Sequence, residues 1–363
     1  MPSPYSDFRR SELFKPAIIV PTVIMLVFSI FNLTAPADPA RILSSFELGI
    51  VNEDIGPFPL VSTKAIKGIS KSLPFRVTLL KDSETARDSL LKGKVSSVIT
   101  FPENFSQLAL SNKNLSIDIL NSQHLTIAET QMASQLPSMM QLALSTFVSN
   151  LRASKLINQS PNSGMLVTTN VETMFQAKSL ASLPAPFVMS FTTWMASMVG
   201  AILLFLGTRQ MAFLNRAYLR TIVPVMTMGL ASFTLATVVT LTTLQWEVFL
   251  MAWLSVWLVS VCLTWLFIGI FEIIGLSALL IILPLVQYQS VLSGSVSPVS
   301  AAPDWLERIG TVIPFDAIGA AYRAIIFGSD ASLPFIWLSS AALIGIVLSW
   351  GSAIFKGRMK RRW

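Results

Sequence analysis

The side chains that perform most catalytic chemistry are scarce in this sequence. Its 363 residues include one histidine, His124, and one cysteine, Cys262. One histidine is too few for a metal site with several histidines and leaves little choice for a Ser-His-Asp triad. A single cysteine forms no intrachain disulfide. We therefore expect a chain that is not an enzyme and that has no catalytic or metal-binding residues, with His124 as a polar residue at the start of a helix.

A nucleotide-binding motif is also missing from the sequence. No Gly-x-x-x-x-Gly-Lys-[Ser/Thr] pattern occurs, and Gly93-Lys94 lacks the upstream glycine and the following hydroxyl residue of a phosphate-binding loop. We expect the chain to bind no cofactor itself, so that any use of ATP passes through a partner subunit.

The composition indicates where the chain resides. Hydrophobic residues make up 53% and charged residues 12% of the sequence, and the mean hydropathy is +0.64. An ordinary soluble domain has about 25% charged residues, and a disordered chain has low hydrophobicity and high charge. Both classes are excluded, which leaves a membrane protein bound to the lipid bilayer.

Six segments are apolar over the roughly 20 residues that a membrane-crossing helix needs. They are 14–35, 187–207, 221–244, 249–270, 273–292 and 333–355. Lys and Arg collect in 1–13, 208–220 and 356–363, and such residues favour the cytoplasmic side. We expect a multi-pass protein of the plasma (inner) membrane with both termini in the cytoplasm. The net charge of +7 then reflects orientation, and we expect no binding to nucleic acid.

The predicted spans hold very few ionisable residues. Glu272 lies at the cytoplasmic junction of the fourth and fifth spans, where we interpret it as a loop or interface residue. A proton- or sodium-coupled transporter usually places charged side chains within its spans, so the pattern argues against one.

The long segment 36–186 has a different character, with 24 of the 45 charged residues of the chain. Short apolar runs alternate with helix-compatible stretches, which predicts an external α/β domain with a mixed sheet between the first and second spans. The expected strands are 46–52, 75–80, 95–101 and 115–120, and the expected helices are 61–73, 83–91, 102–110 and 124–156.

Two further segments have patterns of their own. In 208–220 three arginines alternate with apolar residues: Arg209, Met211, Phe213, Arg216 and Arg220. Two interpretations stay open, an interfacial helix that docks a cytoplasmic partner and a basic loop that only sets the topology.

The other segment, 293–332, is too apolar for a free loop and too broken for a span. We interpret it as an external re-entrant segment that contains Pro303, Trp305 and Pro314. Arg323 would extend to the membrane surface or pair with Asp316.

Three motifs give the chain a family resemblance: 50–56 (IVNEDIG), 98–106 (VITFPENFS) with 86–93 before it, and 185–190 (APFVMS). With these motifs the chain resembles the membrane subunits of type-2 ABC transporters, and most of all the branch that includes the YhgE/Pip proteins. The segment 303–328 is similar to the external re-entrant region of that family.

The resemblance implies a six-span permease that works as a homodimer or with a paired permease subunit. A cytoplasmic ABC ATPase would dock near 208–220, and the pair would export a hydrophobic or amphipathic substrate, such as a drug, a lipid-linked molecule or a peptide. The external segment is large for a minimal permease of this kind. The alternative is therefore a non-transporting surface protein, phage-receptor-like or belonging to a secretion apparatus, whose external domain binds a macromolecule.

Overall fold

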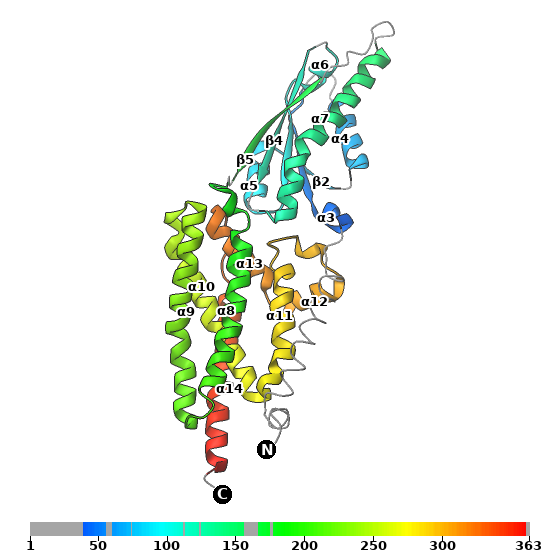
Figure 1. The fold of residues 1–363 in the computed structure, drawn as a ribbon. Helices are drawn as coiled ribbons and strands as arrows, with labels where there is room; N and C mark the ends of the chain where they lie inside the picture. Colours follow the sequence, from blue (N-terminus) through cyan, green and yellow to red (C-terminus); the bar gives the residue numbers. More distant parts are fainter. Residues whose placement is uncertain are drawn as a thin grey trace, which may run out of the picture.

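The computed structural model describes residues 39–55, 60–73, 75–111, 113–122, 125–155, 166–174 and 177–360. The predicted first span, the N-terminal segment before it, His124 and the last three residues of the tail lie outside the described residues. Figure 1 shows an elongated molecule with a β-sheet region at one end and a bundle of long helices at the other.

The described residues of the sheet region form five strands. They are β1 (Glu47–Asn52), β2 (Arg76–Leu80), β3 (Ser97–Phe101), β4 (Leu115–Ser122) and β5 (Val167–Met174). Their order is β2-β1-β3-β4-β5, and only the β3–β4 pair is antiparallel. The small α/β region with a mixed sheet is therefore confirmed.

Helices lie on both faces of this sheet. They are α3 (Pro39–Ser45), α4 (Leu60–Ser72), α5 (Ser83–Leu91), α6 (Phe105–Ala109) and α7 (Ile127–Lys155). Helices α4 and α7 cover one face and α5 lies on the other (Figure 1). The predicted start of α5 is confirmed, because the side chain of Asp82 accepts a hydrogen bond from the backbone N–H of Thr85 at 2.7 Å.

The described residues of the bundle form seven helices and four short 3-10 turns. They are η1 (Leu180–Ser182), α8 (Ala185–Gly207), α9 (Phe213–Thr243), η2 (Trp246–Val248), α10 (Phe249–Ile274), η3 (Gly275–Ala278), α11 (Leu279–Leu292), η4 (Val299–Ala301), α12 (Asp304–Val312), α13 (Phe315–Phe327) and α14 (Phe335–Lys360). Helix α14 extends past the predicted sixth span into the segment predicted as a separate tail.

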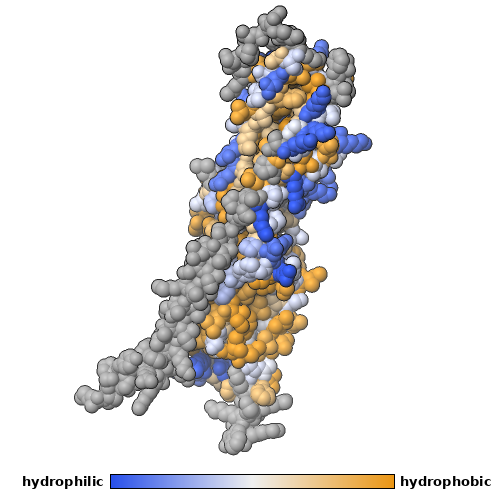
Figure 2. Space-filling model, turned by 90° about the vertical axis from the view of Figure 1, so that its right-hand side faces the viewer, coloured by the Kyte–Doolittle hydropathy of each residue, from blue (hydrophilic) through white to orange (hydrophobic). Residues whose placement is uncertain are grey.

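Four helical segments among the described residues are long and apolar enough to cross a membrane. They are Ala185–Gly207, Phe213–Thr243, Trp246–Leu292 and Phe335–Phe355, and the bent pair α12–α13 makes a fifth if it counts as one span. On the face drawn in Figure 2, hydrophobic residues gather over the bundle, below the more hydrophilic sheet region. Several helices thus fit a membrane, while the total of six spans stays a prediction.

The predicted fourth and fifth spans fall within the one segment Trp246–Leu292. Gly275 has a φ of +64° and ends α10, since the left-handed region favours glycine. Glu272 near this end of α10 contacts Arg220 near the start of α9, whereas Gln289 of α11 donates to Ser190 near the start of α8. Helix α11 therefore returns towards the sheet end of the bundle, as Figure 1 shows.

Indole groups of α10 join it to α9. The Nε1–H groups of Trp253, Trp257 and Trp265 donate to the backbone carbonyls of Gly229, Val225 and Thr221, at 3.0, 2.8 and 3.0 Å. Each acceptor lies one helical turn from the next. Because lipid offers no hydrogen-bonding partner, polar groups must be satisfied inside the protein, and this series does so while fixing the register of the two helices.

The sheet region is attached to the bundle through the start of α7. The backbone N–H groups of Ile127 and Ala128 donate to the carbonyls of Ser295 and Val296 at 3.2 and 3.0 Å. The first N–H groups of a helix have no partner within it, so the segment after α11 supplies the cap. Arg41 of α3 adds a hydrogen bond of 2.8 Å to Asp304 of α12.

Helices α10 and α14 cross where each has a glycine. A Cβ atom added to Gly269 would lie 2.8 Å from Cα of Gly345, and one added to Gly345 would overlap the backbone of Trp265. Small residues allow such close contact between helices in membranes.

This crossing predicts the effect of adding one methyl group. Gly345→Ala should destabilise the protein by about 1–3 kcal/mol, because the new Cβ has no room and the helices must separate. Gly351→Ala on the same helix is the control, since a Cβ there meets nothing within 4 Å. Thermal unfolding of the purified full chain checks this, and a Gly345→Ala variant as stable as Gly351→Ala would contradict the close crossing.

Candidate functional site

The connection between α8 and α9 is shorter than predicted. Helix α8 ends at Gly207, Thr208 is its C-cap, and α9 already begins at Phe213. The predicted loop 208–220 is thus reduced to a turn of a few residues. Residues 213–220 contain no glycine or proline, so nothing interrupts the helix there and α9 gains two turns at its start.

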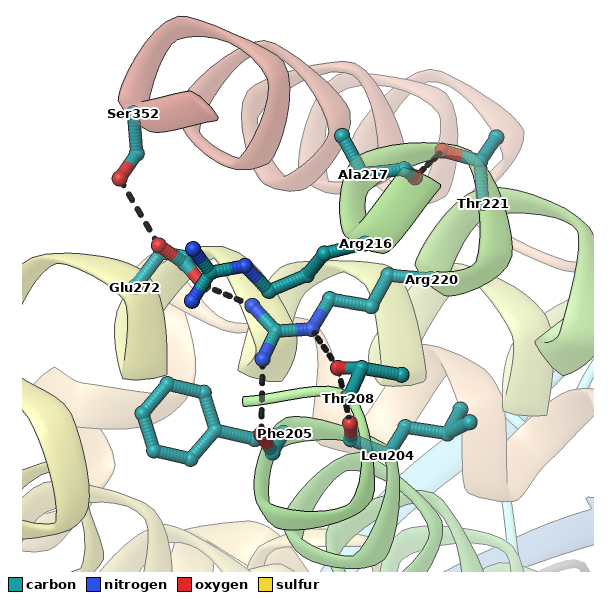
Figure 3. Close-up of polar contacts among 9 residues, drawn as sticks. All are labelled: Leu204, Phe205, Thr208, Arg216, Ala217, Arg220, Thr221, Glu272 and Ser352. Carbon is teal, nitrogen blue, oxygen red and sulfur yellow. Dashed lines mark hydrogen bonds and ion pairs between the residues drawn. The ribbon is translucent and has the colours of Figure 1, made fainter. Parts of the chain in front are cut away.

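A buried arginine, Arg220, joins the helices at this end of the bundle by hydrogen bonds. The side chain of Arg220 is 1% exposed. Its Nε–H donates to Oγ1 of Thr208 at 2.7 Å and its Nη2 to the carbonyl of Phe205 at 2.8 Å, both at the end of α8. Its Nη1 donates to Oε1 of Glu272 on α10 (Figure 3).

Glu272 joins this arginine to a fourth helix. Its Oε2 accepts a hydrogen bond from the hydroxyl of Ser352 on α14 at 2.8 Å, and Nη1 of Arg216 lies 4.0 Å from its Oε1. One carboxylate therefore connects α9, α10 and α14, and through Arg220 also α8 (Figure 3). This agrees with the interpretation of Glu272 as an interface residue.

The energetics of the pair follow from its burial. Moving an isolated charge out of water costs several kcal/mol, and a partner with good hydrogen-bonding geometry offsets that cost. The side chains of Arg220 and Glu272 are 1% and 4% exposed. Neither has enough contact with water to be solvated alone, so each holds the other in place.

The opposite side of the first two turns of α9 and the connection before it are exposed and largely apolar. Met211 is 44% exposed, and Leu214 and Tyr218 are each 57% exposed. Arg209 is exposed beside them. Leu214 and Tyr218 are four positions apart and so lie on one face of α9. We call Arg209, Met211, Leu214 and Tyr218 the end patch.

The five residues predicted in this segment therefore divide into two groups. Arg209 and Met211 lie in the end patch. Phe213 and Arg216, which are half-buried, and Arg220, which is buried, form its support, with Cζ of Arg216 4.8 Å above the ring of Phe213.

The sequence prediction did not include Leu214 and Tyr218 among the docking residues, although both are apolar residues of this segment, and it did not identify the partner of Arg220. The helical period could have found the first two, because Arg216 and Arg220 share one face of α9 and Leu214 and Tyr218 share another. For the partner the signal was weaker: Glu272 was the one acidic residue in reach of a predicted span at this end.

The predicted re-entrant segment is a pair of helices bent by 76°. Pro303 and Pro314 directly precede α12 and α13, where the missing N–H of proline costs nothing. Trp305 is 45% exposed and its ring meets Tyr288 at 5.6 Å. Arg323 donates to the carbonyls of Ser293 and Gly294 at 3.2 and 2.6 Å, so it fixes the chain after α11.

Comparison with known proteins gives no sequence match and a low structural similarity. No protein-family model matches the chain, and no curated protein sequence matches it. Among solved structures it is similar to a "crystal structure of a domain of a putative ABC type-2 transporter from Thermotoga maritima MSB8", with 18% identity over 35% of this chain and 86% of that one. The TM-score is 0.26, which does not establish a shared fold.

The buried pair predicts an asymmetry between single and double substitutions. Arg220→Met should cost about 3–5 kcal/mol of stability, because it removes the buried hydrogen-bonded partner of Glu272 and leaves Arg216, at 4.0 Å, as the cation facing its carboxylate. Arg220→Met with Glu272→Gln should recover most of that loss, since no buried charge then remains in this pair. Denaturant titration in mixed micelles measures these free energies.

Arg209→Met is the matched control, because the same change at an exposed position of the same segment should stay within about 0.5 kcal/mol. The contradicting result is a double variant whose free energy of unfolding falls by the sum of the losses in Arg220→Met alone and Glu272→Gln alone. Such additivity would show that the two side chains do not stabilise each other.

Proposed function

We propose that this chain is the membrane permease subunit of an ABC-type exporter, powered by a separate ATPase that docks on the end patch. The observation that carries the proposal is the end patch on its support of Phe213, Arg216 and Arg220. A partner that pushes on these residues moves α8, α9, α10 and α14 together, because Arg220 and Glu272 link all four helices.

The distribution of charge in the bundle supports an external source of energy. The acidic and basic residues of α8, α9, α10 and α11 are Arg216, Arg220 and Glu272, and all three lie at the end of the bundle that carries the patch. Coupling to protons or sodium ions usually uses ionisable groups inside the membrane. These four helices offer no such relay along their lengths, which supports another chain as the source of energy.

The composition of the end patch supports a protein as its partner. Exposed Met and Tyr with a flanking Arg are residue types enriched at protein interfaces. The patch also lies at the end of the bundle away from the sheet region (Figure 1), where a subunit on the cytoplasmic side would meet it in the predicted orientation. The substrate class in this proposal is the hydrophobic or amphipathic one that the sequence resemblance implies, and the permease works as a dimer.

Site-directed crosslinking tests the docking. The single cysteine of the chain, Cys262, is buried, so Leu214→Cys adds the one accessible thiol. In native membranes, a thiol-linked photocrosslinker at this position should yield an adduct with a chain that also reacts with a photoreactive ATP analogue. Leu79→Cys is the control, because Leu79 is 68% exposed but lies in the sheet region.

Two results would contradict the proposal. One is the absence of any ATP-binding adduct from Leu214→Cys. The other is an equal yield of that adduct from Leu79→Cys, which would show contact without a specific site. Unchanged export in a Leu214→Asp variant would favour the alternative of a surface protein that does not transport.

A further inference from the structure

The face of the sheet that carries α5 is only partly covered by the described residues. Helix α5 packs over β1, β2 and β3, where Ala86 and Leu90 meet Val51 and Val98 in a small core. Strands β4 and β5 continue beyond α5. A cavity of about 530 Å³ lies at this step, within the range of about 300–1,000 Å³ that is common for small-molecule sites.

The sheet registers give this cavity a polar row. Thr100 of β3 pairs with Asp118 of β4, and Asp118 pairs with Asn170 of β5. All three line the cavity, so a hydroxyl, a carboxylate and an amide stand side by side on one line across the sheet. Asn170 donates to Oδ1 of Asp118 at 3.0 Å, which holds the carboxylate in place without neutralising it.

The next row along the strands is mostly apolar. Val98 of β3 pairs with Leu120 of β4, and Leu120 pairs with Glu172 of β5. Ala86 of α5 faces the same cavity. The cavity therefore has a polar region at Asp118 and an apolar region in the neighbouring row, which suits a ligand with both characters.

The charges around the cavity are unbalanced. Its described lining holds three carboxylates, from Glu53, Asp118 and Glu172, and one cation, Arg87. Arg87 is paired with Glu172 at 2.8 Å. Glu53 accepts a hydrogen bond of 2.6 Å from the hydroxyl of Ser83 in the first turn of α5, where the helix dipole also favours a negative charge. The third carboxylate, Asp118, accepts a hydrogen bond from the neutral amide of Asn170 within this lining. That contact leaves its negative charge in place.

We propose that this cavity binds an amphipathic organic cation, with the cationic group at Asp118 and Glu53 and the apolar portion over Leu120 and Val98. The described residues bring no three potential metal-ligating side chains together, and apolar side chains form much of the lining, which favours an organic cation over a metal ion. This site stands whether or not the chain is a permease.

Binding of a defined probe to the full chain tests the site. The probe is hexyltrimethylammonium, with hexanoate and hexanol as anionic and neutral controls of the same chain length. Calorimetric titration into nanodiscs of neutral lipid, with empty discs subtracted, should show saturable binding of the cation at one site per chain and none of the controls. Raising the salt concentration should weaken binding, because salt screens exposed charges.

Four variants locate the site. Asp118→Asn keeps the shape and should weaken binding about tenfold, the value of one charge-assisted contact. Glu53→Gln should weaken it less, because Ser83 and the helix already compensate that charge. Arg87→Gln should strengthen binding, since it frees Glu172. Glu84→Gln, an exposed acid on α5 outside the lining, should change nothing.

The proposal is overturned by any of three results. The first is binding of hexanoate or hexanol with the affinity of the cation. The second is unchanged binding in both Asp118→Asn and Glu53→Gln. The third is a heat signal from the protein discs no larger than from empty discs, which would mean that the probe only enters lipid. The variants replace side chains at the cavity surface or on the exposed side of α5, so each should fold, and its melting temperature confirms this.

Discussion

The end of the bundle away from the sheet region depends on one buried pair of opposite charges, Arg220 and Glu272. Glu272 and Arg220 lie where neither can reach bulk water, so each is tolerable only while the other is present. The ends of α8 and α14 supply the remaining hydrogen bonds through Thr208, Phe205 and Ser352. The short connection between α8 and α9 is thereby held against two other helices, α10 and α14. The proposed function requires such a connection, because a docked partner moves the bundle only through residues that are held to it.

The rest of the bundle meets the same requirement with neutral groups. Lipid accepts no hydrogen bonds, and so Trp253, Trp257 and Trp265 direct their indole N–H groups to carbonyls of α9. Threonines along α9 return their hydroxyls to the carbonyl one turn back, as Thr227 and Thr234 do. At Gly269 and Gly345 the backbones themselves come into contact. These neutral contacts fix the register and spacing of the helices along the bundle. The Arg220–Glu272 pair is needed only at its end.

Much of the fold was predictable from local patterns, and the failures have physical causes. Helix α5 has the predicted bounds because Asp82 and Gly93 mark its ends in the sequence. Strand β5 was missed because Thr168, Asn170 and Glu172 interrupt any apolar run. These residues lie on the face of the sheet that α5 covers only over β1, β2 and β3, so side chains of β5 on that face need no apolar partner.

The candidate site was predictable only to a limited extent, for a different reason. The arginines of 208–220 were evident, but a sequence pattern does not tell an arginine on the surface from one paired inside. The partner of Arg220 lies 52 positions away on another helix, and no local period reports such a contact. The cavity on the sheet likewise depends on the strand registers that bring Thr100, Asp118 and Asn170 into one row.

The central claim is that the Arg220–Glu272 pair holds the α8–α9 connection against the bundle. Backbone amide hydrogen exchange of the full chain in nanodiscs, compared between the native protein and Glu272→Gln, tests it most directly. The account predicts exchange faster by about tenfold or more in peptides covering residues 205–220, with no change in peptides from β1 and β3. Equal exchange rates in 205–220 would contradict it, because the connection would then be held by something other than this pair.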